Sequence, residues 1–222
     1  MKRKSKNTFI SGLIFIMLFI IWTVAVVSVD VKSVGVNGTS VGFATLNTWF
    51  HNLTKVNMTL YNITDWAGLV PIFICMFFGV VGLIQLIKRK SLLKVDFDII
   101  ILGIYYIIVI LFYLIFEMIP INYRPIFING FAECSYPSST TLLVLSVMPT
   151  LVFQTKKRVK KHILKQIILY FSIAFSIFMV IGRLISGVHW ITDIIGACLI
   201  SAGLYYLYKG IVLWNLEKNF KI

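Results

Sequence analysis

Residues 166–193 read QIILYFSIAFSIFMVIGRLISGVHWITD, an apolar run that ends in charged and titratable side chains. The run is long enough for a helix that crosses a membrane. His189 and Asp193 are four residues apart, so on a helix they share one face, and the carboxylate can orient the imidazole as a base or nucleophile. Arg183 adds a planar charge suited to phosphate or carboxylate oxygens. For these three residues alone, a structural ion pair at the membrane surface is the alternative.

Similar apolar runs recur along the whole chain. The mean hydropathy is +0.92, and 59% of residues are hydrophobic while 13% are charged. This composition predicts an all-α bundle of six transmembrane helices and a single integral membrane domain over residues 1–222. The predicted spans are residues 8–29, 66–87, 97–119, 138–153, 166–186 and 189–214. The fourth is short and opens in polar residues, so we expect it to begin within a site.

The first outer segment contains a further helical pattern. From Gly42 to Trp66, apolar and aromatic side chains recur at helical spacing. This pattern predicts an amphipathic helix that lies in the membrane interface. His51 falls within it, and we interpret it as an interfacial histidine.

The net charge of +13 is concentrated in four basic segments, residues 2–6, 88–94, 156–165 and 209–221. All four fall on the same side of a six-helix topology. The positive-inside rule therefore predicts a multi-pass plasma membrane protein with both termini in the cytoplasm. Attraction to anionic membrane lipids accounts for these segments, so we expect no nucleic-acid partner. The short loops favour a bacterial membrane.

The same topology brings several polar residues to the outer face. Arg124 and Arg183 are the two arginines predicted there. After Pro137, Ser138 and Ser139 begin a helix whose free N–H groups form an anion site, although an ordinary helix cap is the alternative. Together with His189 and Asp193, these residues can hold a phosphoryl group and offer it a nucleophile.

These residues follow a familiar order: Arg124-Pro125, then Pro137-Ser138, then Arg183-x5-His189-x3-Asp193. The order resembles the three-part signature of the phosphatidic acid phosphatase type 2 (PAP2)/haloperoxidase superfamily, in its membrane lipid phosphatase branch. The resemblance covers residues 66–210 and includes the six-helix layout.

The resemblance implies a role for each site residue. His189 attacks phosphorus and forms a phosphohistidine, and Asp193 orients it. Arg124 and Arg183 bind the phosphate. The further phosphate donors are Ser138, Ser139, Thr140 and backbone amides.

Two positions depart from the family pattern. Glu117 stands where a lysine usually precedes the first arginine, and Thr140 stands where a histidine usually protonates the leaving alcohol. General acid catalysis contributes roughly 10²–10⁴-fold, so this loss slows the reaction without abolishing it. A buried Glu117 or Glu133 is a candidate substitute.

We therefore expect a metal-independent phosphatase, without a cofactor, that hydrolyses a lipid phosphate or lipid (prenyl) pyrophosphate at the outer face. No compact acidic or histidine cluster has metal-ligand spacing. The alternative is a non-catalytic family member that binds lipid phosphates, as the departures at Glu117 and Thr140 suggest. Transfer of the phosphoryl group to an acceptor other than water remains open. A small transporter ranks last because few polar residues fall at mid-membrane.

Overall fold

The computed structural model describes residues 3–219, and within this range the chain is helical. The helices are α1 (Arg3–Ser28), α2 (Ala44–Thr54), α3 (Met58–Ala67), α4 (Leu69–Arg89), α5 (Phe97–Met118), α6 (Ser139–Arg158), α7 (His162–Ile185) and α8 (Ile191–Asn219), with short 3-10 helices η1 (Val36–Gly38) and η2 (Leu92–Lys94). In this part of the chain, β pairing is limited to three isolated bridges. The prediction of an all-α fold is confirmed.

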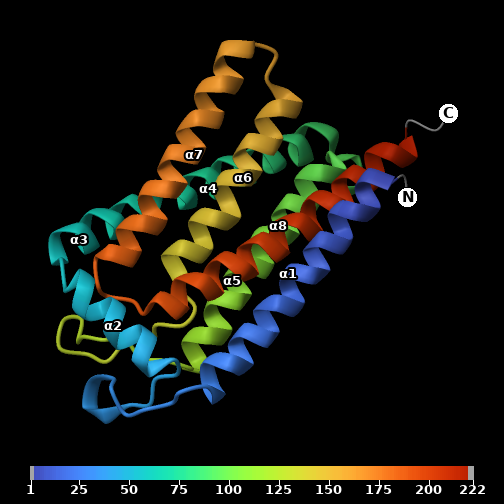
Figure 1. Ribbon diagram of the computed structural model, residues 1–222. Coiled ribbons are helices and arrows are strands. Elements are labelled where there is room, and N and C mark those ends of the chain that lie inside the picture. The colour runs from blue at the N-terminus through green and yellow to red at the C-terminus, as the bar shows by residue number, and fades with distance from the viewer. Residues whose placement is uncertain (1–2, 220–222) are drawn as a thin grey trace.

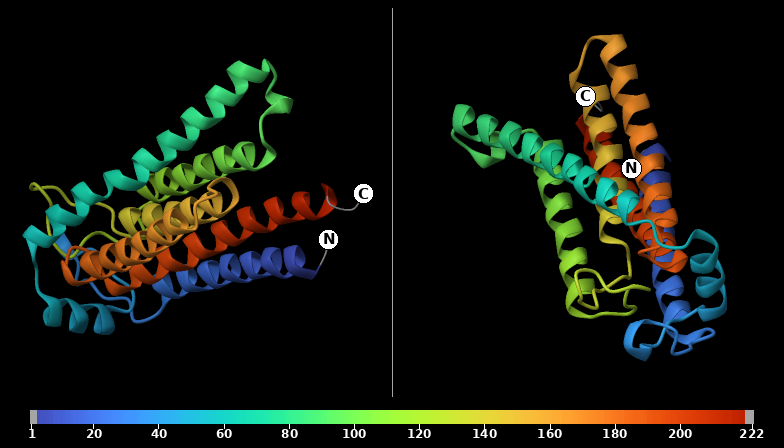
Figure 2. Two further views of the ribbon diagram at one scale, coloured as in Figure 1. Left: turned by 90° about the horizontal axis from the view of Figure 1, so that it is seen from above. Right: turned by 90° about the vertical axis from the view of Figure 1, so that its left-hand side faces the viewer.

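The long helices lie roughly along one direction and form a bundle with two distinct ends (Figures 1 and 2). The beginning of α1, the end of α8 and the turns α4–α5 and α6–α7 lie toward one end, which we call the basic end. Helices α2 and α3 and the loop over residues 119–138 lie at the other, which we call the loop end. Helices α1 and α8 pack side by side along their lengths. Every basic segment predicted to be cytoplasmic, where it is described, therefore lies toward the basic end.

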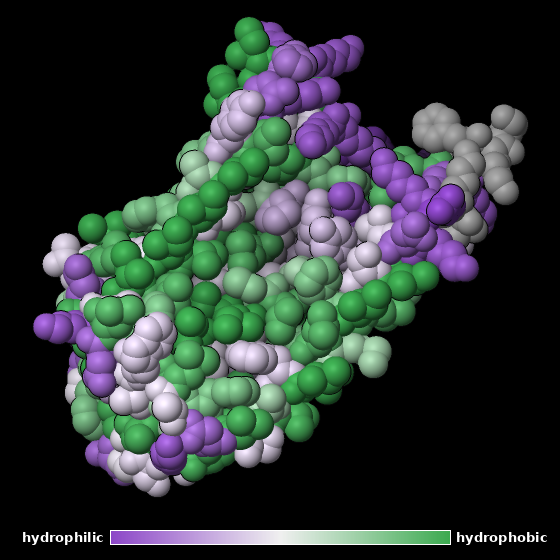
Figure 3. Space-filling view, viewed as in Figure 1, coloured by the Kyte–Doolittle hydropathy of each residue, from purple (hydrophilic) through white to green (hydrophobic). Residues whose placement is uncertain are grey.

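Within residues 3–219, five helical segments are long and apolar enough to cross a membrane. They are Arg3–Ser28, Met58–Arg89, Phe97–Met118, His162–Ile185 and Ile191–Lys218. Apolar side chains cover the visible flanks of the bundle, and hydrophilic residues gather toward its two ends (Figure 3). Apolar surface of this extent is stable in contact with lipid tails. The chain is a multi-pass membrane protein.

Helix α6 occupies the interior of the bundle, where it contacts α4, α5, α7 and α8. It contains more polar residues than the five spans. Several of those that are buried have hydrogen-bond partners on neighbouring helices. The hydroxyls of Thr150 and Tyr106 lie 2.7 Å apart, and Gln154 Nε2 donates to Tyr208 Oη at 2.7 Å. A helix surrounded by protein tolerates such residues when each is hydrogen-bonded.

The two ends of α6 lie at opposite ends of the bundle. Just before its first residue, the Ser138 N–H donates to the carbonyl oxygen of Asp193 at 3.2 Å, at the loop end. At its last turn, Lys157 and Arg158 each pair with Asp98 at the start of α5, with N–O distances of 2.7 Å. The helix thus covers residues 139–158 and is longer than the predicted span 138–153. The count of six transmembrane helices stays a prediction.

The first outer segment contains two helices, α2 and α3, instead of the single predicted helix over residues 42–66. The break falls at Lys55, whose φ is +54°, and Asn57 then caps α3 by accepting from the Leu60 N–H at 2.9 Å. The Asn57 N–H donates to the carbonyl oxygen of Ser186 at 2.9 Å. This hydrogen bond holds the connection between α2 and α3 against the turn between α7 and α8, and the chain bends at that contact. Interfacial placement of these helices stays a prediction.

Candidate active site

The turn between α7 and α8 positions the three residues with which the sequence analysis began. Arg183 lies in the last turn of α7, His189 in the connecting turn, and Asp193 in the first turn of α8. Gly187, with a φ of +69°, redirects the chain after α7. His189 therefore lies outside a helix, and the expectation that it shares a helix face with Asp193 is wrong. All three side chains are buried, at 3% exposure or less.

Ser135 joins His189 to Asp193. The Ser135 hydroxyl lies 3.0 Å from His189 Nδ1 and 2.5 Å from Asp193 Oδ2, whereas Nδ1 and Oδ2 are 3.8 Å apart. A carboxylate only accepts hydrogen bonds, so the one hydroxyl proton is donated to Asp193. The Ser135 oxygen then accepts from Nδ1–H. This tautomer leaves the lone pair of His189 on Nε2.

Asp193 is itself held from two further directions. The Trp190 backbone N–H donates to Oδ2 at 2.9 Å, and Asn122 Nδ2 donates to Oδ1 at 3.4 Å. These bonds fix the carboxylate at the helix N-terminus, where a negative charge is favourable. The histidine is thus oriented by a rigid network.

Two arginines lie beside His189. The guanidinium carbons of Arg183 and Arg124 lie 4.9 Å and 5.6 Å from the ring centroid of Tyr61, so one aromatic ring supports both charges. Burial and the charges of Arg124 and Arg183 hold the pKa of His189 well below its usual range. The imidazole is therefore neutral at pH 7 and able to act as a nucleophile.

Each arginine has one acidic neighbour. Arg183 Nη2 donates to Asp65 Oδ1 at 2.9 Å and also bonds the hydroxyl of Thr140. Arg124 Nε lies 3.2 Å from Glu133 Oε2, close enough for an ion pair but without hydrogen-bond geometry.

Several nitrogen atoms of this cluster are buried and have no hydrogen-bond partner. They are Nε and Nη1 of Arg124, Nε and Nη1 of Arg183, and Nε2 of His189. An unsatisfied buried polar group costs about 1–3 kcal/mol, and more when it is charged. The four guanidinium nitrogens can donate to the oxygens of a tetrahedral anion. The lone pair on Nε2 of His189 can attack the central atom of that anion.

The residues at the start of α6 take different places relative to this site. Thr140 reaches Arg183, and Ser139 lines two cavities beside it. Ser138 is fully buried, and its hydroxyl donates to Thr141 Oγ1 at 3.1 Å. Its side chain is thus engaged within the helix start, and the first-turn N–H groups are the donors that α6 offers to an anion.

A cavity of about 490 Å³ lies between α4, α5 and α6. Asp65, Ser139 and Thr140 line it, and Asp65 and Thr140 also bond Arg183. Its walls are mostly apolar and include Ile72, Val109 and Leu143. The cavity thus adjoins the charged cluster through the two residues that bond Arg183.

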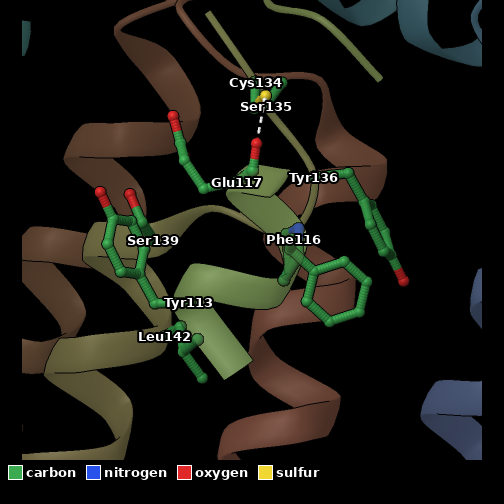
Figure 4. Close-up of a pocket in the computed structure, with 9 residues that line it drawn as sticks. Tyr113, Phe116, Glu117, Cys134, Ser135, Tyr136, Ser139 and Leu142 are labelled. Carbon is green, nitrogen blue, oxygen red and sulfur yellow. Dashed lines mark hydrogen bonds between the residues drawn. The ribbon is translucent and has the colours of Figure 1, made fainter. Parts of the chain in front are cut away.

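Glu117, where the family pattern has a lysine, lines a separate small pocket with Tyr113, Ser139 and Cys134 (Figure 4). The Cys134 thiol donates to the Glu117 carbonyl oxygen at 3.4 Å. A carboxylate in this place adds negative charge on the side of the site formed by α5.

Sequence reasoning missed Tyr61, Asp65, Asn122 and Ser135. A charged residue at the end of the apolar pattern in residues 42–66 was the one available signal, and it pointed to Asp65. Ser135 and Asn122 stand in a loop without periodicity, so only the tertiary structure shows that they contact Asp193.

Comparisons with known proteins bear on the fold. No family model and no curated protein sequence matches the chain. A similar solved structure is the crystal structure of a transmembrane PAP2-type phosphatidylglycerolphosphate phosphatase from Bacillus subtilis. It is 17% identical, with a TM-score of 0.64 over 92% of this chain and 96% of that one. The chain therefore has the fold of a PAP2-type transmembrane phosphatase.

Proposed function

We propose that this protein is an integral membrane phosphatase that hydrolyses a lipid phosphate or lipid pyrophosphate. The observation that carries the proposal is the set of buried nitrogens on Arg124, Arg183 and His189 that have no hydrogen-bond partner. A protein that bound no anion here would leave several charged donors unsatisfied at a cost in stability. A phosphoryl group satisfies them and places phosphorus beside Nε2.

The proposed reaction begins with attack of His189 Nε2 on phosphorus. Arg124 and Arg183 neutralise the phosphoryl oxygens, and the first-turn N–H groups of α6 stabilise the charge that develops in the transition state. The phosphohistidine ring becomes cationic, and Asp193 offsets that charge through Ser135. Water then attacks the phosphohistidine and releases phosphate. No metal ion takes part in these steps.

A lipid is the proposed substrate because the charged cluster adjoins an apolar cavity inside a membrane-spanning bundle. One hydrocarbon tail enters between α4 and α5 while the headgroup reaches the arginines. The similar crystal structure is that of a phosphatidylglycerolphosphate phosphatase, which supports a lipid phosphate. With six spans and cytoplasmic termini, the site at the loop end faces the outer side of the membrane.

The test is phosphate release by detergent-purified protein from lipid monophosphates and lipid pyrophosphates, with a chelator present. We expect release by the wild-type protein and none by His189→Ala. Trapping of 32P on the wild-type protein, labile to acid and stable to base, identifies the phosphohistidine. Tight binding of the lipid phosphate without any release contradicts the proposal and supports a non-catalytic binder, in which Asp65 and Thr140 occupy Arg183.

A further inference from the structure

Hydrolysis of an alkyl phosphate needs a proton donor as well as a nucleophile. The leaving alkoxide is strongly basic, and a positioned acid accelerates its departure by about 10²–10⁴-fold. His189 is occupied as the nucleophile, and the hydroxyl of Thr140 is no proton source at neutral pH. Another residue therefore has to supply the proton if the proposed function holds.

Four carboxyl groups lie near the arginines, and the geometry separates them. Asp193 is fully buried behind His189, where Ser135, Trp190 and Asn122 already donate to it. Glu133 lies beside Arg124, and Glu117 lines the small pocket. Neither glutamate lines the large apolar cavity. Asp65 does, and it also bonds Arg183.

The place of the leaving oxygen follows from the shape of the substrate. This oxygen links phosphorus to the hydrocarbon tail, so it lies between the arginine cluster and the apolar cavity. Asp65 and Thr140 line the cavity, and both contact Nη2 of Arg183. His189 does not line the cavity, which agrees with a nucleophile that attacks from the opposite side.

We propose that Asp65 is the general acid of this site and protonates the leaving oxygen of a lipid phosphate. Asp65 is paired with Arg183 in the protein without substrate, so the proton comes with the substrate: a phosphoryl group that binds at Arg183 as its monoanion passes its proton to the adjacent Asp65 carboxylate. Substrate binding thus brings the proton to the oxygen that needs it. Asp65 thus acts as the general acid, a role that Thr140 cannot perform because its hydroxyl is not acidic enough.

The reaction proceeds through two displacements at phosphorus. As His189 Nε2 forms its bond to phosphorus, the bond from phosphorus to the leaving oxygen breaks, and its electron pair stays on that oxygen with the proton from Asp65. Water then attacks phosphorus and gives one proton back to Asp65. The phosphorus–nitrogen bond breaks, its electron pair returns to Nε2, and inorganic phosphate leaves.

The test compares two leaving groups in purified protein: dodecyl phosphate, which releases an alkoxide, and 4-nitrophenyl phosphate, which releases a stable phenolate. We expect Asp65→Asn to lower kcat/KM for dodecyl phosphate about 10²–10⁴-fold and for 4-nitrophenyl phosphate less than about tenfold. The Asp65 side chain is 56% exposed, so the amide fits without repacking. Adding Thr140→His to Asp65→Asn places an imidazole at the same arginine nitrogen and should restore hydrolysis of dodecyl phosphate.

Glu133→Gln and Glu117→Gln are the matched controls, and we expect each to leave the ratio of the two substrates unchanged. The inference is overturned if Asp65→Asn changes both substrates equally, if it raises both because Asp65 only blocks Arg183, or if a glutamate variant alone shows the leaving-group effect. A wild-type protein that hydrolyses neither substrate nor any lipid phosphate overturns the proposed function, and the inference with it.

Discussion

At the scale of single residues, His189 is set up as a neutral nucleophile. Burial and the two arginine charges lower its pKa, because both disfavour the imidazolium form. The folded protein therefore keeps a neutral imidazole at a pH where the unfolded chain, with an ordinary pKa of about 6.5, takes up a proton. It follows that this group contributes less to stability as pH falls below about 6.5.

This shift is measurable by NMR of the histidine ring in a His51→Gln, His162→Gln background, where His189 is the remaining histidine. We expect its signals to show the neutral, Nδ1-protonated ring throughout the range from pH 8 to about pH 6. Inorganic phosphate should raise the protonation midpoint, because a bound anion offsets the arginine charges. A midpoint at or above about 6.5 without phosphate would contradict the site described here.

The sequence could supply some of these residues and not others. Arg183, His189 and Asp193 were found because they interrupt an apolar segment, where charged groups are costly and so stand out. Their mutual geometry was not predictable, because Gly187 takes His189 out of the helix and Ser135 comes between it and Asp193. Contacts from separate loops leave no periodic signal.

At the scale of elements, apolar periodicity located the strongly hydrophobic helices well. Helix α6 was predicted too short because its last residues, 154–158, are polar or basic, and a single apolar run does not reveal their partners Tyr208 on α8 and Asp98 on α5. The break between α2 and α3 was missed for a related reason. It is set by the packing of Lys55–Asn57 against the α7–α8 turn and not by a local breaker residue.

That packing makes Gly187 a sensitive position. Its φ is +69°, and a Cβ atom there would lie 1.8 Å from the carbonyl oxygen of Lys55. Gly187→Ala therefore combines a backbone cost of about 1–2 kcal/mol with displacement of the α2–α3 connection. We expect a clear fall in Tm, at about 2–4 °C per kcal/mol, together with loss of phosphate release because His189 moves.

Gly130→Ala is the control for backbone strain alone. Gly130 also has a positive φ, +83°, but nothing lies within 4 Å of the Cβ position. The Tm of the Gly130→Ala variant should fall only by the amount that the backbone strain costs, and its phosphate release should be unchanged. Equal effects in both variants would show that the contact between Gly187 and Lys55 does not hold the site together.

At the scale of the whole molecule, the charge distribution predicts a membrane topology that the helix packing makes testable. The described basic segments lie toward the basic end, and the arginine cluster lies at the loop end. Helix α6 decides whether the chain crosses the membrane five or six times, because its composition alone does not mark it as a span. Its contacts with Asp193 at one end and Asp98 at the other are the reason that we predict a sixth crossing, beside α5.

Labelling of single cysteines in intact cells tests this crossing, after Cys75, Cys134 and Cys198 are replaced. Asn129→Cys lies in the loop before α6, and Lys160→Cys lies in the turn after it. If α6 spans the bilayer, a membrane-impermeant maleimide labels position 129 in intact cells and position 160 only after lysis, with Lys94→Cys behaving like position 160. If both positions label alike, α6 does not cross, the termini lie on opposite sides, and the basic segments no longer follow the positive-inside rule.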